Sequence, residues 1–139
     1  MKQVRELMHT PVYTVGPKDT LRHAVHVMNE HHVRQLPVSQ DGGLAGIITD
    51  RDIRLHVIYL EDRAESGDTF NEALETQVED VMTTDVKWLH PEQSALDAAD
   101  LFITEKFGGA PVVDEDEQLV GIVTYIDLLI ELKRLLGNK

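Results

Sequence analysis

The sequence contains no cysteine among its 139 residues. This absence excludes a disulfide scaffold, a zinc site built from thiolates and a cysteine nucleophile. Long apolar runs are also missing, since stretches such as 119–123 fall far short of the roughly 20 residues that a membrane span needs. The first residues lack the basic, apolar and small-residue order of a signal peptide. We therefore expect a cytoplasmic protein that does not enter a membrane.

Basic residues are scarce, with 13 Lys and Arg against 25 Asp and Glu and a net charge of −12. Such a balance disfavours nucleic acid as a partner, because phosphates require a basic surface. Residues 1–60 nevertheless hold seven basic against six acidic residues, and six of the seven histidines. A small anion should therefore find its positive partners in this first part, although the acidic excess elsewhere is equally explained as a device for solubility.

The chain contains an internal repeat, in which residues 4–54 match residues 78–129. The residues that recur 74 positions later are Val4, Met8, Thr10, Val12, Pro17, Ala24, Pro37 and Val38. One extra residue enters near Asp116, after which Leu44, Gly46, Ile47, Thr49 and Asp52 recur as Leu119, Gly121, Ile122, Thr124 and Asp127. Identical residues in one order with a single gap indicate a duplicated structural unit.

Each copy predicts the same succession of elements. An extended segment (12–15 and 86–89) precedes a helix, for which Thr20 and Ser94 are suitable N-caps. Two strands follow, at 36–39 and 44–49 in the first copy and at 110–113 and 119–124 in the second. A closing helix begins near Asp50 or near Tyr125. The sequence therefore predicts an α+β (mixed α/β) fold of two β-α-β-β-α repeats.

About 50 residues bury too little apolar surface to be stable alone, so the two repeats should pack as one pseudo-twofold unit. We place the first repeat at 1–60 and the second at 78–139. The polar, acidic stretch 61–77 reads as a helical linker between them.

Three pairs of motifs resemble a known family. They are Met8-His9-Thr10 with Met82-Thr83-Thr84, Leu36-Pro37-Val38 with Ala110-Pro111-Val112, and 46–52 with 121–127, which fit a Gly-h-x-Ser/Thr-x-x-Asp signature. Together they resemble a cystathionine-β-synthase (CBS) domain pair, or Bateman module, over nearly the whole chain. The resemblance implies modules that pair into discs and, in many members, clefts between repeats that bind AMP, ADP, ATP or S-adenosylmethionine.

The last of these motifs suits a nucleotide on chemical grounds. Thr49 and Thr124 carry hydroxyls at a helix start, where free N–H groups and the helix dipole favour phosphate. Asp52 and Asp127 follow one turn later, and a carboxylate can accept hydrogen bonds from both ribose hydroxyls. The alternative is structural, because a Thr N-cap with an acid in the first turn stabilises a helix without any ligand.

The resemblance implies that each cleft draws on both repeats. One site would combine Thr124, Asp127, Val12, Thr14, Val33 and Arg34, and the other Thr49, Asp52, Val86, Trp88, Phe107 and Gly108. Phe107 would stack on the purine, with core packing as the alternative for both aromatic residues. Arg34, Arg51 and Arg54 would supply the cations, since the second copy has Ile126 and Leu129 at the last two equivalent positions.

The histidines do not form a convincing metal site, because His31 and His32 are adjacent and diverge on a helix while zinc needs three or four converging ligands. No nucleophile with a neighbouring base is visible either, so we do not expect an enzyme.

We expect instead a non-catalytic sensor that binds an adenosine nucleotide as its regulatory ligand and requires no cofactor. The alternatives are an assembly scaffold without ligand and a binder of S-adenosylmethionine. Apolar closing helices (53–60 and 126–136) predict a homodimer, with an unknown effector protein as a further partner.

Overall fold

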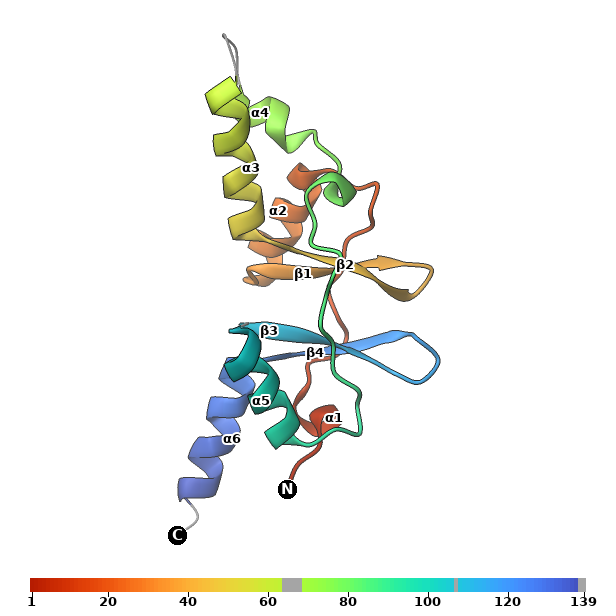
Figure 1. Ribbon diagram of the computed structural model, residues 1–139, viewed down its shortest axis with the longest axis vertical. Coiled ribbons are helices and arrows are strands. Elements are labelled where there is room, and N and C mark those ends of the chain that lie inside the picture. The colour runs from red at the N-terminus through yellow and green to blue at the C-terminus, as the bar shows by residue number, and fades with distance from the viewer. Residues whose placement is uncertain (64–68, 107, 138–139) are drawn as a thin grey trace. The chain divides into compact units, whose positions relative to one another are not determined.

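The computed structural model describes residues 1–63, 69–106 and 108–137 (Figure 1). It divides into two compact units. The central unit is Tyr13–Val86, and the terminal unit joins Met1–Val12 to Lys87–Lys139. Each unit therefore contains most of one repeat together with the first residues of the other. Part of the expected linker, residues 64–68, lies outside the described residues.

The central unit follows the predicted order of elements. Its helices and strands are α2 (Leu21–His31), β1 (Gln35–Gln40), β2 (Gly43–Thr49), α3 (Asp50–Arg63), α4 (Thr69–Leu74) and the 3₁₀ turn η1 (Val78–Asp80). The Thr20 hydroxyl accepts a hydrogen bond from the His23 N–H at 3.2 Å, as expected of an N-cap. Asp41 and Gly42 both have positive φ, the conformation that a two-residue hairpin turn requires.

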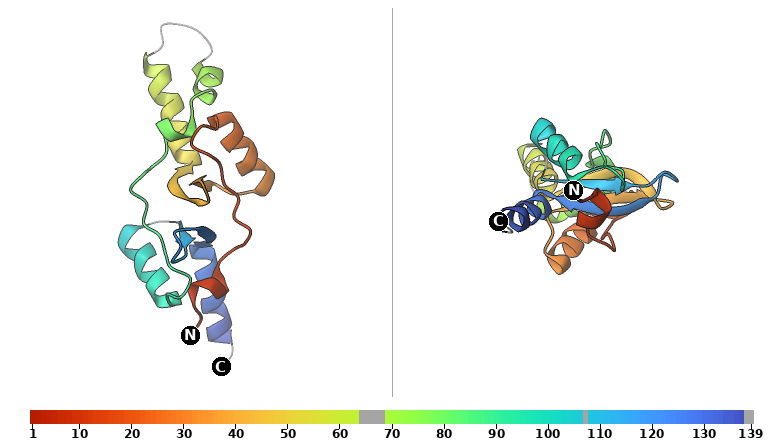
Figure 2. Two further views of the ribbon diagram at one scale, coloured as in Figure 1. Left: turned by 90° about the vertical axis from the view of Figure 1, so that its right-hand side faces the viewer. Right: turned by 90° about the horizontal axis from the view of Figure 1, so that it is seen from below.

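The terminal unit repeats this order. Its elements are α1 (Val4–Leu7), α5 (Ala95–Glu105), β3 (Gly109–Val113), β4 (Leu119–Thr124) and α6 (Tyr125–Gly137). Ser94 caps α5 in a reciprocal capping box with Asp97. The short helix α1 lies beside α6 (Figure 2). The predicted mixed fold of two repeats, each with helices and an antiparallel hairpin, is confirmed.

The first extended segment of each repeat is shorter than the sequence predicts. Val15 forms a single parallel bridge with Val38 of β1, and Leu89 forms one with Val112 of β3. Gly16-Pro17 and His90-Pro91 follow at once, and proline has no N–H with which to continue a ladder. The expected strands 12–15 and 86–89 are therefore reduced to one bridging residue each.

The opposite edge of each hairpin is completed by residues from the other repeat. Thr83 forms an antiparallel bridge with Ile47 of β2, and His9 forms one with Ile122 of β4. The glycine of each signature makes room for this crossing segment. A Cβ atom at Gly46 would lie 2.7 Å from both Met82 Sδ and the Thr83 carbonyl oxygen, closer than real Cβ contacts come. The Met motif of each repeat thus packs against the signature glycine of the other repeat.

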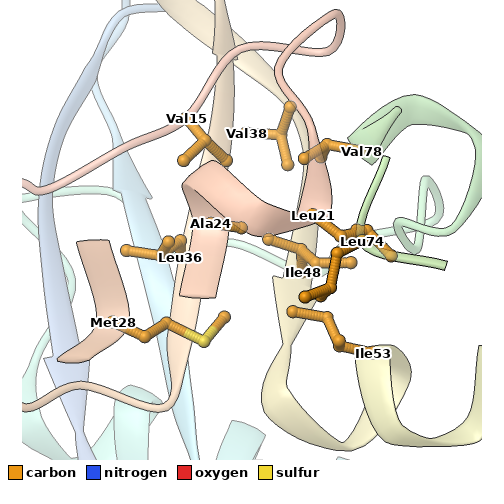
Figure 3. Packing of buried hydrophobic residues seen from close by; sticks show 10 residues of the cluster. All are labelled: Val15, Leu21, Ala24, Met28, Leu36, Val38, Ile48, Ile53, Leu74 and Val78. Carbon is orange, nitrogen blue, oxygen red and sulfur yellow. The ribbon is translucent and has the colours of Figure 1, made fainter. Parts of the chain in front are cut away.

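Each unit has its own hydrophobic core. In the central unit ten buried residues from α2, the segment before it, both strands, α3, α4 and η1 pack together (Figure 3): Val15, Leu21, Ala24, Met28, Leu36, Val38, Ile48, Ile53, Leu74 and Val78. The terminal core contains Val4, Leu89, Ala98, Phe102, Ala110, Val112 and Val123. Burying one large apolar side chain contributes about 1.5–3 kcal/mol, so these clusters hold the strand-to-helix turns in place. No helix in the described part is long and apolar enough to cross a membrane.

Candidate functional site

The two Thr-x-x-Asp turns occupy equivalent places in the two units. Thr49 is the last residue of β2 and α3 begins at Asp50, while Thr124 ends β4 and α6 begins at Tyr125. The first N–H of each helix donates a hydrogen bond to the carbonyl oxygen of the residue that precedes the hairpin. In the central unit the Asp50 N–H donates to the Arg34 carbonyl oxygen at 2.9 Å. In the terminal unit the Tyr125 N–H donates to the Gly108 carbonyl oxygen at 3.1 Å. Sheet and helix therefore meet without a loop, which fixes the position of the aspartate one turn later.

In the central unit Thr49 and Asp52 form a reciprocal cap. The Thr49 N–H donates to Asp52 Oδ2 at 3.0 Å, and the Asp52 N–H donates to the Thr49 hydroxyl at 3.1 Å. Thr49 and Asp52 therefore do cap the start of α3, the structural role that the sequence offers as an alternative to ligand binding. It leaves part of the carboxylate free, because Asp52 Oδ1 forms no hydrogen bond with the described residues and the side chain is only half-buried.

In the terminal unit the equivalent carboxylate is engaged more fully. Both the Thr124 N–H, at 2.7 Å, and the Thr124 hydroxyl, at 3.1 Å, lie within hydrogen-bond distance of Asp127 Oδ2. The other oxygen, Oδ1, lies 2.6 Å from His9 Nε2. Only 7% of the Asp127 side chain is exposed. The sequence treats His9 merely as part of a motif, and nothing in the chain order signals a contact across 118 positions.

The three arginines proposed as phosphate partners are all exposed and belong to the central unit. Arg34 lies beside the start of α3 through its backbone bond to Asp50. Arg54 Nη2 is 3.9 Å from Asp50 Oδ2, a weak surface ion pair. Arg51 forms no ion pair with the described residues. Exposed cations are therefore present at the start of α3 and on the residue bonded to it.

Arg34 and Arg54 also border a cleft of about 840 Å³ that lies within the central unit. Its lining comes from α2, α3 and α4 and the residues after α2, and includes apolar and polar side chains: Val25, Met28, Asn29, His32, Val33, Arg34, Asp50, Ile53, Arg54, Val57, Ile58, Glu61, Phe70 and Leu74. Sequence reasoning missed this cleft, because the contribution of α4 follows only from its packing against α3.

The remaining predicted site residues are distributed over both units. Thr14, Val33 and Val86 are half-buried in the central unit, and Val12 is half-buried in the terminal unit. Trp88 is 51% exposed, so core packing does not account for it. Gly108 is exposed at the start of α6, and Phe107 lies outside the described residues. The crosswise grouping of these residues into two clefts stays a prediction.

The histidines do not converge on a metal centre: in the described ranges, no three His, Asp or Glu side chains are placed to hold an ion. His26 pairs with Glu30 at 3.3 Å on the exposed face of α2. His31 stacks on Tyr13 with ring centroids 3.6 Å apart.

Comparison with known proteins identifies the class to which this fold and these turns belong. The family model described as CBS domain matches residues 4–59 and 78–134. The CBS domain-containing protein YhcV of Bacillus subtilis (strain 168) is 35% identical over 94% of this chain and 85% of its own length. The chain therefore belongs to the CBS domain family and carries two CBS repeats.

Two solved structures resemble the whole chain. One is CBSX2 in complex with AMP, with a TM-score of 0.79 and 26% identity over 97% of this chain and 98% of that one. The other is the CBS domain pair of protein MJ0100 in complex with 5-methylthioadenosine and S-adenosyl-L-methionine, with a TM-score of 0.77 and 25% identity over 99% and 98% of the two chains. Adenosine compounds are thus the ligands of both of these similar structures.

Proposed function

We propose that this chain is a non-catalytic regulatory module whose ligand is an adenosine nucleotide of the AMP, ADP or ATP class. The observation that carries the proposal is the Asp52 carboxylate, which is half-buried at the start of α3 and has one oxygen without a hydrogen bond from the described residues. A ribose diol is a suitable donor for such an oxygen, and each charge-assisted hydrogen bond contributes about 1.5–3 kcal/mol.

The charges near this turn favour a phosphorylated ligand over bare adenosine. Arg34, Arg51 and Arg54 are exposed, and two of them border the cleft beside Asp50. A phosphate near the start of α3 would also meet the positive end of the helix dipole. No comparable set of cations belongs to the turn at Thr124, where Ile126 and Leu129 replace the two arginines.

S-adenosylmethionine is the second candidate ligand, because a similar solved structure contains it. Its sulfonium is cationic, so the arginines disfavour it at the Asp52 turn. The third candidate is an assembly scaffold without ligand. A panel of adenosine, AMP, ATP and S-adenosylmethionine in a thermal-shift assay separates these possibilities, since binding to the folded state raises the melting temperature.

The proposed function predicts that AMP and ATP raise the melting temperature more than adenosine, and that added salt weakens the nucleotide effect. Equal shifts for adenosine and AMP would remove the role of the arginines. No shift with any of the four compounds would favour the scaffold.

We further propose that the module acts as a homodimer in the cytoplasm, through the exposed apolar residues of its closing helices. On α3 these are Leu55, Ile58 and Tyr59, and on α6 they are Ile126, Leu129, Ile130, Leu132, Leu135 and Leu136. Exposed apolar side chains gathered along a helix in this way are typical of an interaction site. Ligand occupancy would then be transmitted through the geometry of the dimer, or to an effector protein that contacts it.

A further inference from the structure

His9 and Thr83 occupy the same place in the two units. Each lies at the outer edge of a hairpin, where His9 bridges Ile122 of β4 and Thr83 bridges Ile47 of β2. The His9 N–H donates to the Ile122 carbonyl oxygen at 2.8 Å, and the Thr83 N–H donates to the Ile47 carbonyl oxygen at 2.9 Å. Because the two bridges have the same register, the two side chains start from matched positions beside their Thr-x-x-Asp turns.

The two aspartates differ in the hydrogen-bonding capacity that they retain. An ionised carboxylate offers about four lone-pair sites. At Asp127 the two groups of Thr124 occupy Oδ2 and His9 occupies Oδ1, so three sites are taken. Among the described residues, only the Thr49 N–H donates to the Asp52 carboxylate, and Thr83 forms no hydrogen bond with it. Two free sites, which a ribose diol needs, are present at Asp52 and absent at Asp127.

The burial of the two carboxylates points in the same direction. The Asp127 side chain is 7% exposed, whereas the His9 side chain that contacts it is 64% exposed. The buried Asp127 carboxylate is therefore contacted by a side chain that is itself largely exposed. A ligand that presents two hydroxyls to Asp127 must displace this ring, because only one lone-pair site remains free there. Asp52 Oδ1, in contrast, has no hydrogen-bond partner among the described residues.

We propose that His9 blocks Asp127 from binding a ribose diol, so that Asp52 is the single aspartate of the two that binds one. This inference rests on the proposed function and assigns its stoichiometry, one nucleotide per chain. Both turns share the Thr-x-x-Asp pattern. The capacity of their aspartates differs because the matched position in the preceding motif is His9 in one repeat and Thr83 in the other.

Reciprocal substitution tests the role of His9. His9→Thr gives the terminal unit the residue of the central unit, and Thr83→His does the reverse. Titration calorimetry with AMP should give one site per chain in the natural sequence and two in His9→Thr. Thr83→His should bind AMP about 10- to 100-fold more weakly, since the ligand must now displace one charge-assisted hydrogen bond.

The double variant His9→Thr/Thr83→His provides the matched control. It should again bind one AMP, and this binding should be lost on adding Asp127→Asn rather than Asp52→Asn. Thermal unfolding of each variant shows whether it is folded, and the double variant retains the composition of the natural chain.

Several outcomes would overturn the inference. Two equal AMP sites in the natural chain, or an unchanged single site in both His9→Thr and Thr83→His, would contradict the role of His9 while leaving the proposed function intact. A failure of AMP to bind the natural chain and every variant would overturn the proposed function, and this inference with it.

Discussion

At the scale of single residues, Gly46 and Gly121 are confined by different kinds of neighbour. A Cβ atom on Gly46 would meet the Thr83 carbonyl oxygen at 2.7 Å, whereas the three nearest atoms at Gly121 all belong to the flexible side chain of Met8. A methionine side chain can change its rotamer to make room for an added Cβ atom, whereas a backbone carbonyl cannot. Gly46→Ala should therefore lower the free energy of unfolding by about 1–3 kcal/mol, and Gly121→Ala by less.

Denaturant unfolding measures both changes, with Gly137→Ala as the control because nothing lies within 4 Å of a Cβ there. A smaller loss for Gly46→Ala than for Gly121→Ala would show that the crossing segment at Thr83 is not held rigidly against β2.

The two signature aspartates should also differ in their contribution to stability. Asp127 is buried and receives hydrogen bonds from His9 and Thr124, whereas Asp52 is half-buried and caps α3 through Thr49. Asp127→Ala should lower the free energy of unfolding by about 2–4 kcal/mol. Asp52→Ala should lower it by only about 1 kcal/mol, the usual contribution of a helix cap. Urea unfolding of the ligand-free variants compares these two free energies. Equal decreases would contradict the claim that Asp127 is held by more hydrogen bonds than Asp52.

At the scale of elements, α6 is tied to the first residues of the chain by a buried carboxylate. Glu131 accepts hydrogen bonds from Arg134 at 3.1 Å and pairs with Lys2 at 3.3 Å. The hydrogen bond from Arg134 is the largest cause that lowers the pKa of Glu131 from 4.5 to about 2; burial acts in the opposite direction, and Lys2 assists Arg134. The folded state therefore binds the proton less readily than the unfolded state.

The pH dependence follows from this lowered pKa. The stabilisation by ionised Glu131 is fully present above pH 4.5 and is lost as the pH falls through about 2. Glu131→Gln should be less stable than the natural chain at pH 7, and should lose less additional stability between pH 4.5 and 2. Thermal unfolding of both proteins across this pH range measures the difference. If their melting temperatures fell in parallel as the pH is lowered, the contribution of the ionised Glu131 would be contradicted.

Most elements could be predicted because their signals are local. Thr20 and Ser94 mark helix starts, and Asp41-Gly42 marks the hairpin, in each case through a neighbour fewer than four residues away. The exchange of first segments between repeats could not be predicted in this way. An offset of 74 residues shows that Met8 is equivalent to Met82, but not which hairpin each segment completes. The contact between His9 and Asp127 was missed for the same reason.

At the scale of the whole molecule, the closing helices present apolar side chains to solvent. Ile130 on α6 is 64% exposed and Ile103 on α5 is 74% exposed. If the dimer forms through α3 and α6, Ile130→Lys should convert it to a monomer, because burying an unpaired charge is unfavourable. Ile103→Lys is the matched control and should leave the dimer intact. Sedimentation velocity distinguishes the two, and a monomeric natural chain at tens of micromolar would contradict the proposed dimer.

The central claim is that the free carboxylate oxygen of Asp52 binds the ribose of an adenosine nucleotide. Titration calorimetry of AMP against the natural chain and Asp52→Asn tests it most directly, because the substitution preserves the shape of the side chain and removes its charge. We predict about 30- to 1000-fold weaker binding by Asp52→Asn, corresponding to about 2–4 kcal/mol, with the variant still folded. Binding of AMP by Asp52→Asn with the affinity of the natural chain would contradict the account.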